Sequence, residues 1–176
     1  MGKASIKENK KIYQVVREEL GLTREQASDL IEGMEAYRLN KIENNFNPTP
    51  DEVFNMAKAY KKPELCSYYC ANECRIGKED NRHEIKVKDL SQIVLKMLDS
   101  LRIMNNAKDN LISITADGEI DDKELEEFCK IQEDLKLMQD NIETLKMWTD
   151  KMIYSGQINE EKYKKLMDKR SNLLKK

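Results

Sequence analysis

The sequence is poor in the residues that build sheets and tight turns. Only 6% of its 176 residues are aromatic, and it has three prolines and six glycines, whereas 36% of its residues are charged. Strands are enriched in aromatic and β-branched residues, while Lys, Glu, Leu and Met, which are abundant here, favour helices. We therefore expect an all-α protein.

Long apolar runs are also missing. No stretch approaches the roughly 18 consecutive apolar residues that cross a bilayer, and the opening segment MGKASIKENKK lacks the apolar centre of a signal peptide. We expect a soluble, cytoplasmic protein without a membrane partner.

Catalytic patterns are absent as well. The single histidine, His83, stands in a polar segment, and the chain has neither a glycine-rich phosphate loop nor the strand-to-helix turn that presents a nucleophilic serine. These absences argue against an enzyme, and we expect no cofactor.

The cysteines do not suggest a disulfide framework. Cys66, Cys70 and Cys74 follow one another at intervals of four, and Cys129 lies far along the chain. On one continuous helix the outer two of the three lie about 12 Å apart, which one metal with bonds of about 2.3 Å cannot bridge. We expect reduced thiols that pack as small apolar side chains, and no metal. A site made by one pair with Cys129 or His83, and redox sensing, remain alternatives.

The first third of the chain predicts short helices separated by clear stop signals. Capping boxes at Thr23 with Gln26 and at Thr49 with Glu52 mark two helix starts. We expect helices at about 6–20, 23–31, 35–44, 50–61 and 64–75, with a tight turn at Glu32-Gly33. Two short helices joined by a glycine turn are typical of a helix-turn-helix domain, which we place at residues 1–80.

The pattern of apolar residues changes after the charged segment 77–84, which predicts a second domain, residues 81–176. Apolar residues recur at helical spacing over about 89–115 and 121–154, and a shorter, more polar helix follows at about 159–174. The second of these stripes consists of Phe128, Ile131, Leu135, Met138, Ile142, Leu145 and Met152. We expect a coiled-coil-like antiparallel hairpin or a three-helix bundle. Apolar surface left over should be covered in a homodimer.

The segment Leu39-Asn40-Lys41-Ile42-Glu43-Asn44 is the most specific motif of the chain. It resembles the end of the recognition helix in the Cro/lambda-repressor (XRE) family of helix-turn-helix regulators, which reads Ile-x-Arg-Ile-Glu-Asn. The resemblance covers residues 8–65, although the turn has one residue more than usual and Asn45 replaces a glycine. The stretch from Leu65-Cys66 to Ile76-Gly77 is similar to that of clostridial-type regulators with a cysteine-containing segment and a helical tail.

The resemblance implies a five-helix, repressor-like domain of a transcriptional regulator that binds double-stranded DNA as a dimer. Carried over by position, the DNA-binding residues would be Arg24 on a phosphate, Ala36, Tyr37 and Lys41 at base edges, Arg38 and Asn40 beside them, and Asn44 near the DNA backbone.

The charge balance leaves a second interpretation open. The net charge is −2, and residues 1–65 carry eleven Lys and Arg against eleven Asp and Glu. Affinity for DNA then depends on where the cations lie. The alternative is a protein–protein interaction module that reuses the helix-turn-helix fold without binding DNA. A protein partner on the helical tail is a further possibility.

Overall fold

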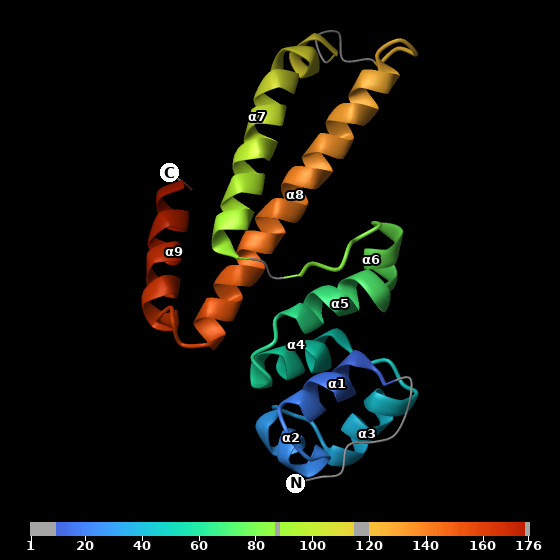
Figure 1. Cartoon of the computed structure of the whole chain (residues 1–176), viewed down its shortest axis with the longest axis vertical. Coiled ribbons are helices and arrows are strands. Elements are labelled where there is room, and N and C mark those ends of the chain that lie inside the picture. The colour runs from blue at the N-terminus through green and yellow to red at the C-terminus, as the bar shows by residue number, and fades with distance from the viewer. Residues whose placement is uncertain (1–9, 87–88, 115–119, 175–176) are drawn as a thin grey trace. The chain divides into compact units, whose positions relative to one another are not determined.

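The computed structural model of the chain describes residues 10–86, 89–114 and 120–174 (Figure 1). Over these residues the protein is all-helical and contains no strand, which confirms the predicted all-α class. The first helix, predicted at about 6–20, begins at Ile12, because Lys11 before it is extended. Residues 6–9 of that prediction, and residues 115–119 between the two predicted long helices, lie outside the described residues. Within the described ranges, no helix combines the length and the apolar character that crossing a membrane requires.

Short helices occupy residues 12–79. They are α1 (Ile12–Glu19), α2 (Arg24–Leu30), α3 (Ala36–Asn44), α4 (Pro50–Ala59), α5 (Glu64–Asn72) and α6 (Arg75–Glu79). Both predicted capping boxes are confirmed at the starts of α2 and α4. At α2, the Thr23 hydroxyl accepts a hydrogen bond from the Gln26 amide at 3.2 Å, and the Gln26 side chain accepts one from the Thr23 amide at 2.9 Å. Two of the orphan amides of the first turn are thereby satisfied.

The predicted fifth helix, 64–75, is two helices. α5 ends at Asn72, and α6 begins at Arg75 after an extended Cys74. A Cβ atom at Gly77 would overlap the backbone carbonyl of Cys70, so the glycine lets α6 lie directly against the backbone of α5. The expected count of five helices in this part of the chain is therefore one too low.

One hydrophobic core joins α1 to α5. Tyr13 of α1, Leu39 and Ile42 of α3 and Met56 of α4 are fully buried in it. The Tyr13 hydroxyl donates a hydrogen bond to Glu73 at 3.0 Å, so this buried phenol has a partner at the segment between α5 and α6. α2 and α3 are therefore held by a core to which the later helices also contribute.

Two long helices form an antiparallel hairpin. α7 (Leu90–Ile114) and α8 (Leu125–Tyr154) run side by side in opposite directions (Figure 1). Ile93 and Ile131 are buried at 1% exposure in this pair. Between them lies a polar layer: the Asn141 side-chain amide donates to the Ser100 hydroxyl at 2.7 Å, and this hydroxyl donates to the Lys96 carbonyl at 3.0 Å. A buried polar pair of this kind fixes the register of two packed helices.

The predicted stripe on α8 is partly wrong. Leu135 and Ile142 are 39% and 50% exposed, while Asn141 is buried and Asp134 is half-buried. At one of these positions the reason is visible: Asn141, and not Ile142 after it, meets α7, because its side-chain amide donates to the Ser100 hydroxyl. The seam of the hairpin therefore contains polar residues that an apolar pattern does not reveal.

The last helix is α9 (Glu160–Leu174), and the side-chain oxygen of Asn159 accepts from the Lys162 amide at 2.8 Å at its start. By their internal contacts the residues form two compact units, Met1–Glu84 with Thr149–Lys176, and Ile85–Trp148. The division into independently folding domains 1–80 and 81–176 stays a prediction.

We predict that Gly77→Ala lowers the free energy of unfolding by about 1–3 kcal/mol, because the new methyl group meets the Cys70 carbonyl and α6 has to move. Urea denaturation of the full chain measures the change. Ile76→Ala is the matched control: Ile76 is 79% exposed, and its truncation should change stability by less than about 0.5 kcal/mol. Equal effects of the two substitutions would show that the close packing at Gly77 does not matter.

Candidate nucleic-acid interface

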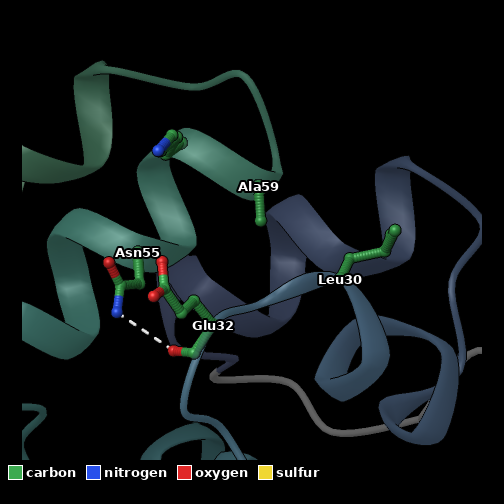
Figure 2. A pocket seen from close by; sticks show the side chains of 5 residues that line it. Leu30, Glu32, Asn55 and Ala59 are labelled. Carbon is green, nitrogen blue, oxygen red and sulfur yellow. Dashed lines mark hydrogen bonds between the residues drawn. The ribbon is translucent and has the colours of Figure 1, made fainter.

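The connection between α2 and α3 is a short glycine turn that is held in place by a hydrogen bond from α4. α2 ends at Leu30, α3 begins at Ala36, and Gly33 between them has φ +70°, a left-handed conformation that favours glycine. The Asn55 side-chain amide donates to the Glu32 carbonyl at 3.0 Å, as Figure 2 shows. A hollow of about 300 Å³ lies beside this bond. The bond ties the turn to α4 and helps to set the direction of α3.

A buried carboxylate joins α1, α2 and α3. Glu43 of α3 has a fully buried side chain, and Arg17 of α1 donates to it from two nitrogens, Nε at 2.5 Å and Nη2 at 2.9 Å. Arg24 of α2 donates to the same carboxylate from Nε at 2.7 Å. The hydrogen bonds that Arg17 donates to the Glu43 carboxylate are the main reason that the pKa of Arg17 is raised. Removing one partner of such a buried pair leaves an uncompensated charge, which costs about 3–5 kcal/mol.

Arg38 of α3 forms an ion pair with Glu52 at the protein surface. Its Nε and Nη2 donate to the two carboxylate oxygens of Glu52 at 2.6 and 2.8 Å, and Nη2 also lies 3.4 Å from the Asn47 carbonyl. Glu52 in turn accepts from the Thr49 amide at 2.7 Å. The hydrogen bonds from Arg38 are the main reason that the pKa of Glu52 is lowered. A residue that was predicted to lie beside the bases of DNA is thus neutralised by a carboxylate of the protein itself.

The outer face of α3 carries a cation between two aromatic rings. The Lys41 Nζ atom lies 4.4 Å from the centre of the Tyr37 ring and 5.5 Å from that of Phe46. Both rings are more than half exposed, with Tyr37 at 67% and Phe46 at 53%. A cation over an aromatic face is held by the ring quadrupole. Lys41 is therefore oriented, and the three side chains present one mixed cationic and aromatic surface.

Phe46 and Lys11 are members of this surface that sequence reasoning missed. The Lys11 Nζ atom donates to the Phe46 carbonyl at 2.8 Å and lies 3.4 Å from the Asn47 side-chain oxygen. Lys11 stands 35 residues before Phe46 in the chain, so no local pattern could have connected them. Phe46 had a weak signal, as an aromatic residue in an otherwise polar loop.

The remaining predicted contacts are less prominent. Ala36 is half-buried at the start of α3. The Asn44 side-chain amide donates to the Asn40 carbonyl at 2.8 Å and to its side-chain oxygen at 2.9 Å, so these two residues bond to each other along the helix. The structure thus brings Tyr37 and Lys41 together on an exposed face, and gives the other predicted residues internal partners or partial burial.

The cysteine segment forms no metal-binding cluster within the described residues. Cys66, Cys70 and Cys74 are half-buried thiols without a disulfide, and Cys74 lies outside α5. Burial raises the pKa of the Cys66 thiol, which disfavours the reactive thiolate. Cys129 is exposed on α8, and His83 is exposed after α6.

Comparisons with known proteins give no match among protein-family models, curated proteins or solved structures.

We predict a pH-dependent contribution from the Arg38–Glu52 pair. Because the pKa of Glu52 lies below its ordinary value of 4.5, the stabilisation is present above pH 4.5 and is lost as the pH falls below it. Glu52→Gln retains the capping group but loses the charge, so it should be less stable than the wild type by roughly 1 kcal/mol at neutral pH. This difference should shrink on acidification.

Urea denaturation between neutral and acidic pH measures the difference. Glu79→Gln, an exposed change at the end of α6, is the control and should show no such dependence. A difference for Glu52→Gln that is constant over the whole pH range would contradict the assignment.

Proposed function

We propose that the protein is a sequence-specific, DNA-binding transcriptional regulator of the Cro/lambda-repressor type, with α2 and α3 as its helix-turn-helix. The observation that carries the proposal is the exposed face of α3, where Lys41 lies between Tyr37 and Phe46 on a helix whose other face is buried in the core. A helix of this kind fits the major groove, where its side chains meet base edges.

In the proposed complex, the cations around α3 contact the phosphates of the DNA backbone. Arg24 stands at the first position of α2, and among the described residues only Glu43 accepts from it, through Nε. Its terminal nitrogens are thus available to a phosphate, the contact that the family resemblance implies. Lys11 at the start of α1 adds a second cation close to the end of α3. Contacts of this kind position a protein on DNA without reading its sequence.

A specific observation favours the second candidate function, a protein-docking module. Arg38 is neutralised by Glu52, Glu32 and Glu35 are exposed in the turn, and Glu25 is exposed at the start of α2, so the surface is not strongly positive. Exposed aromatic residues such as Tyr37 are also typical anchors of protein–protein interfaces. The two functions differ in how binding depends on salt, since phosphate contacts release counterions.

We predict that the full-length protein binds fragmented genomic DNA and that Lys41→Glu weakens this binding roughly tenfold or more. The substitution puts a carboxylate on the face that meets the DNA, and Lys41 is partly exposed, so the fold should be retained. Fluorescence anisotropy over a salt series measures both the affinity and its salt slope, and circular dichroism checks folding.

Lys78→Glu is the matched control, because it changes the net charge equally on exposed α6. Equal losses for the two variants would mean that only net charge matters. No binding by the wild type at low salt would favour the protein-docking function.

We also predict a homodimer, because pairing would place two recognition helices about one DNA turn, about 34 Å, apart. Sedimentation equilibrium over a range of concentrations distinguishes the 20.7 kDa monomer from twice that mass. A strict monomer at tens of micromolar would overturn this prediction and leave DNA binding to a single domain.

A further inference from the structure

The hairpin of α7 and α8 has two sides, and its seam defines them. On α7 the seam follows the less exposed positions Ile93, Met97, Ser100, Met104 and Ala107, and on α8 it follows Ile131, Asp134, Met138, Asn141 and Leu145. Successive side chains on a helix are rotated by about 100° around its axis. Because α7 and α8 run in opposite directions, the residue directly after each seam residue lies on the same side of the hairpin in both helices.

We call this side the forward face. It consists of Val94, Leu98, Leu101, Asn105 and Lys108 on α7 and Gln132, Leu135, Gln139, Ile142 and Lys146 on α8. The residues that precede the seam form the opposite, backward face: Gln92, Lys96, Asp99, Ile103 and Asn106 on α7 and Lys130, Glu133, Leu137, Asp140 and Thr144 on α8.

The forward face presents apolar side chains to solvent. Leu98 is 58% exposed and Leu101 49%, and Ile142 of α8 is 50% exposed. Ser100 and Asn141 are hydrogen-bonded to each other, so Leu101 and Ile142, which follow them, lie next to each other across the hairpin. A contiguous group of exposed leucine, isoleucine and valine side chains marks an interaction site.

The two faces differ in their charged residues. The forward face carries Lys108 and Lys146, both exposed, and no aspartate or glutamate at any of its ten positions. The backward face is mixed: it carries the carboxylates of Asp99, Glu133 and Asp140 beside the cations of Lys96 and Lys130. The forward face is thus a strip of apolar and amide side chains whose only charges are positive.

The two lysines lie toward opposite ends of the apolar strip. Lys108 lies toward the end of α7, and Lys146 lies beyond the Ser100–Asn141 level in the opposite direction, because the helices are antiparallel. Lys108 is eight residues from Ser100, and Lys146 is five residues from Asn141 in the opposite direction. The two lysines are therefore separated along the hairpin axis by roughly 13 residues, or about 20 Å. Leu101, Leu135 and Ile142 lie between them. A bound helix with acidic residues near both of its ends would match this spacing.

We propose that the forward face is a docking surface for an acidic amphipathic helix of another protein. The apolar stripe of the partner would lie against Val94, Leu98, Leu101 and Ile142, and carboxylates near its ends would meet the two lysines. Binding of this kind combines an apolar centre with charge pairs at the rim that select the partner. The inference does not depend on DNA binding by α3.

Charge argues against the other occupants of this surface. Two copies joined by their forward faces would bring four lysines and no carboxylate of these faces into one interface, which opposes association. α9 carries Lys162, Lys164, Lys165, Lys169 and Arg170 against Glu160, Glu161 and Asp168, so it is also basic. An acidic helix is the occupant that complements the face.

The test uses the full-length protein and two synthetic probe peptides of three heptads. Both have leucine at the core positions; one has glutamate and the other lysine at the flanking positions, so that neither associates well with itself. Fluorescence anisotropy should show that the acidic probe binds the wild type, that added salt weakens this binding, and that the basic probe does not bind.

Two double variants identify the surface. Lys108→Glu with Lys146→Glu should weaken binding of the acidic probe about tenfold and admit the basic probe. The matched control, Lys96→Glu with Lys136→Glu, changes the net charge equally at exposed positions away from the forward face and should retain most of the affinity.

Two outcomes would overturn the proposal. The first is failure of the acidic probe to bind, or equal losses in the two double variants when both fold by circular dichroism. The second is a dimer of the wild type that becomes monomeric with Leu98→Ser and Ile142→Ser, which would show that a second copy covers the forward face.

Discussion

The buried carboxylate of Glu43 is the interaction on which the arrangement of the first three helices depends. It accepts hydrogen bonds from Arg17 of α1 and Arg24 of α2 while belonging to α3. A charge inside a protein is tolerated only when its lone pairs are satisfied, so the three helices have one mutual arrangement that satisfies it. Apolar contacts among Tyr13, Leu39 and Ile42 allow more freedom, because they are not directional.

Ion pairs within the protein also reduce the positive charge that the candidate site can offer to a ligand. Of the cations near α3, Arg38 is used by a surface carboxylate and Arg24 is shared with Glu43. The charge that remains for a ligand is therefore small and localised, at Lys11, at Lys41 and at the free end of Arg24. Such a surface gains specificity from a few well-oriented side chains more than from a general attraction, and its binding should be sensitive to geometry.

Local patterns predicted what is locally determined. The caps at Thr23 and Thr49 depend on residues three positions away and were predicted from sequence. The break at Cys74 was missed, because it depends on contact between Gly77 and the backbone of α5. The exposure of Ile142 was missed for a similar reason, since its neighbour Asn141 meets α7 through a bond to a residue 41 positions away in the chain. At the site, the pair of Arg38 with Glu52 joins different helices and leaves no periodic signal.

The polar layer in the hairpin has a mechanical consequence. If α8 slid by one heptad along α7, the Asn141 amide would leave the Ser100 hydroxyl and stand opposite Ile93 or Ala107, where a side chain offers it no acceptor. An unsatisfied buried amide costs about 1–3 kcal/mol, in addition to the lost contact. Sliding is therefore disfavoured, and we expect α7 and α8 to move together, by tilting or rotating as one body, and not along each other.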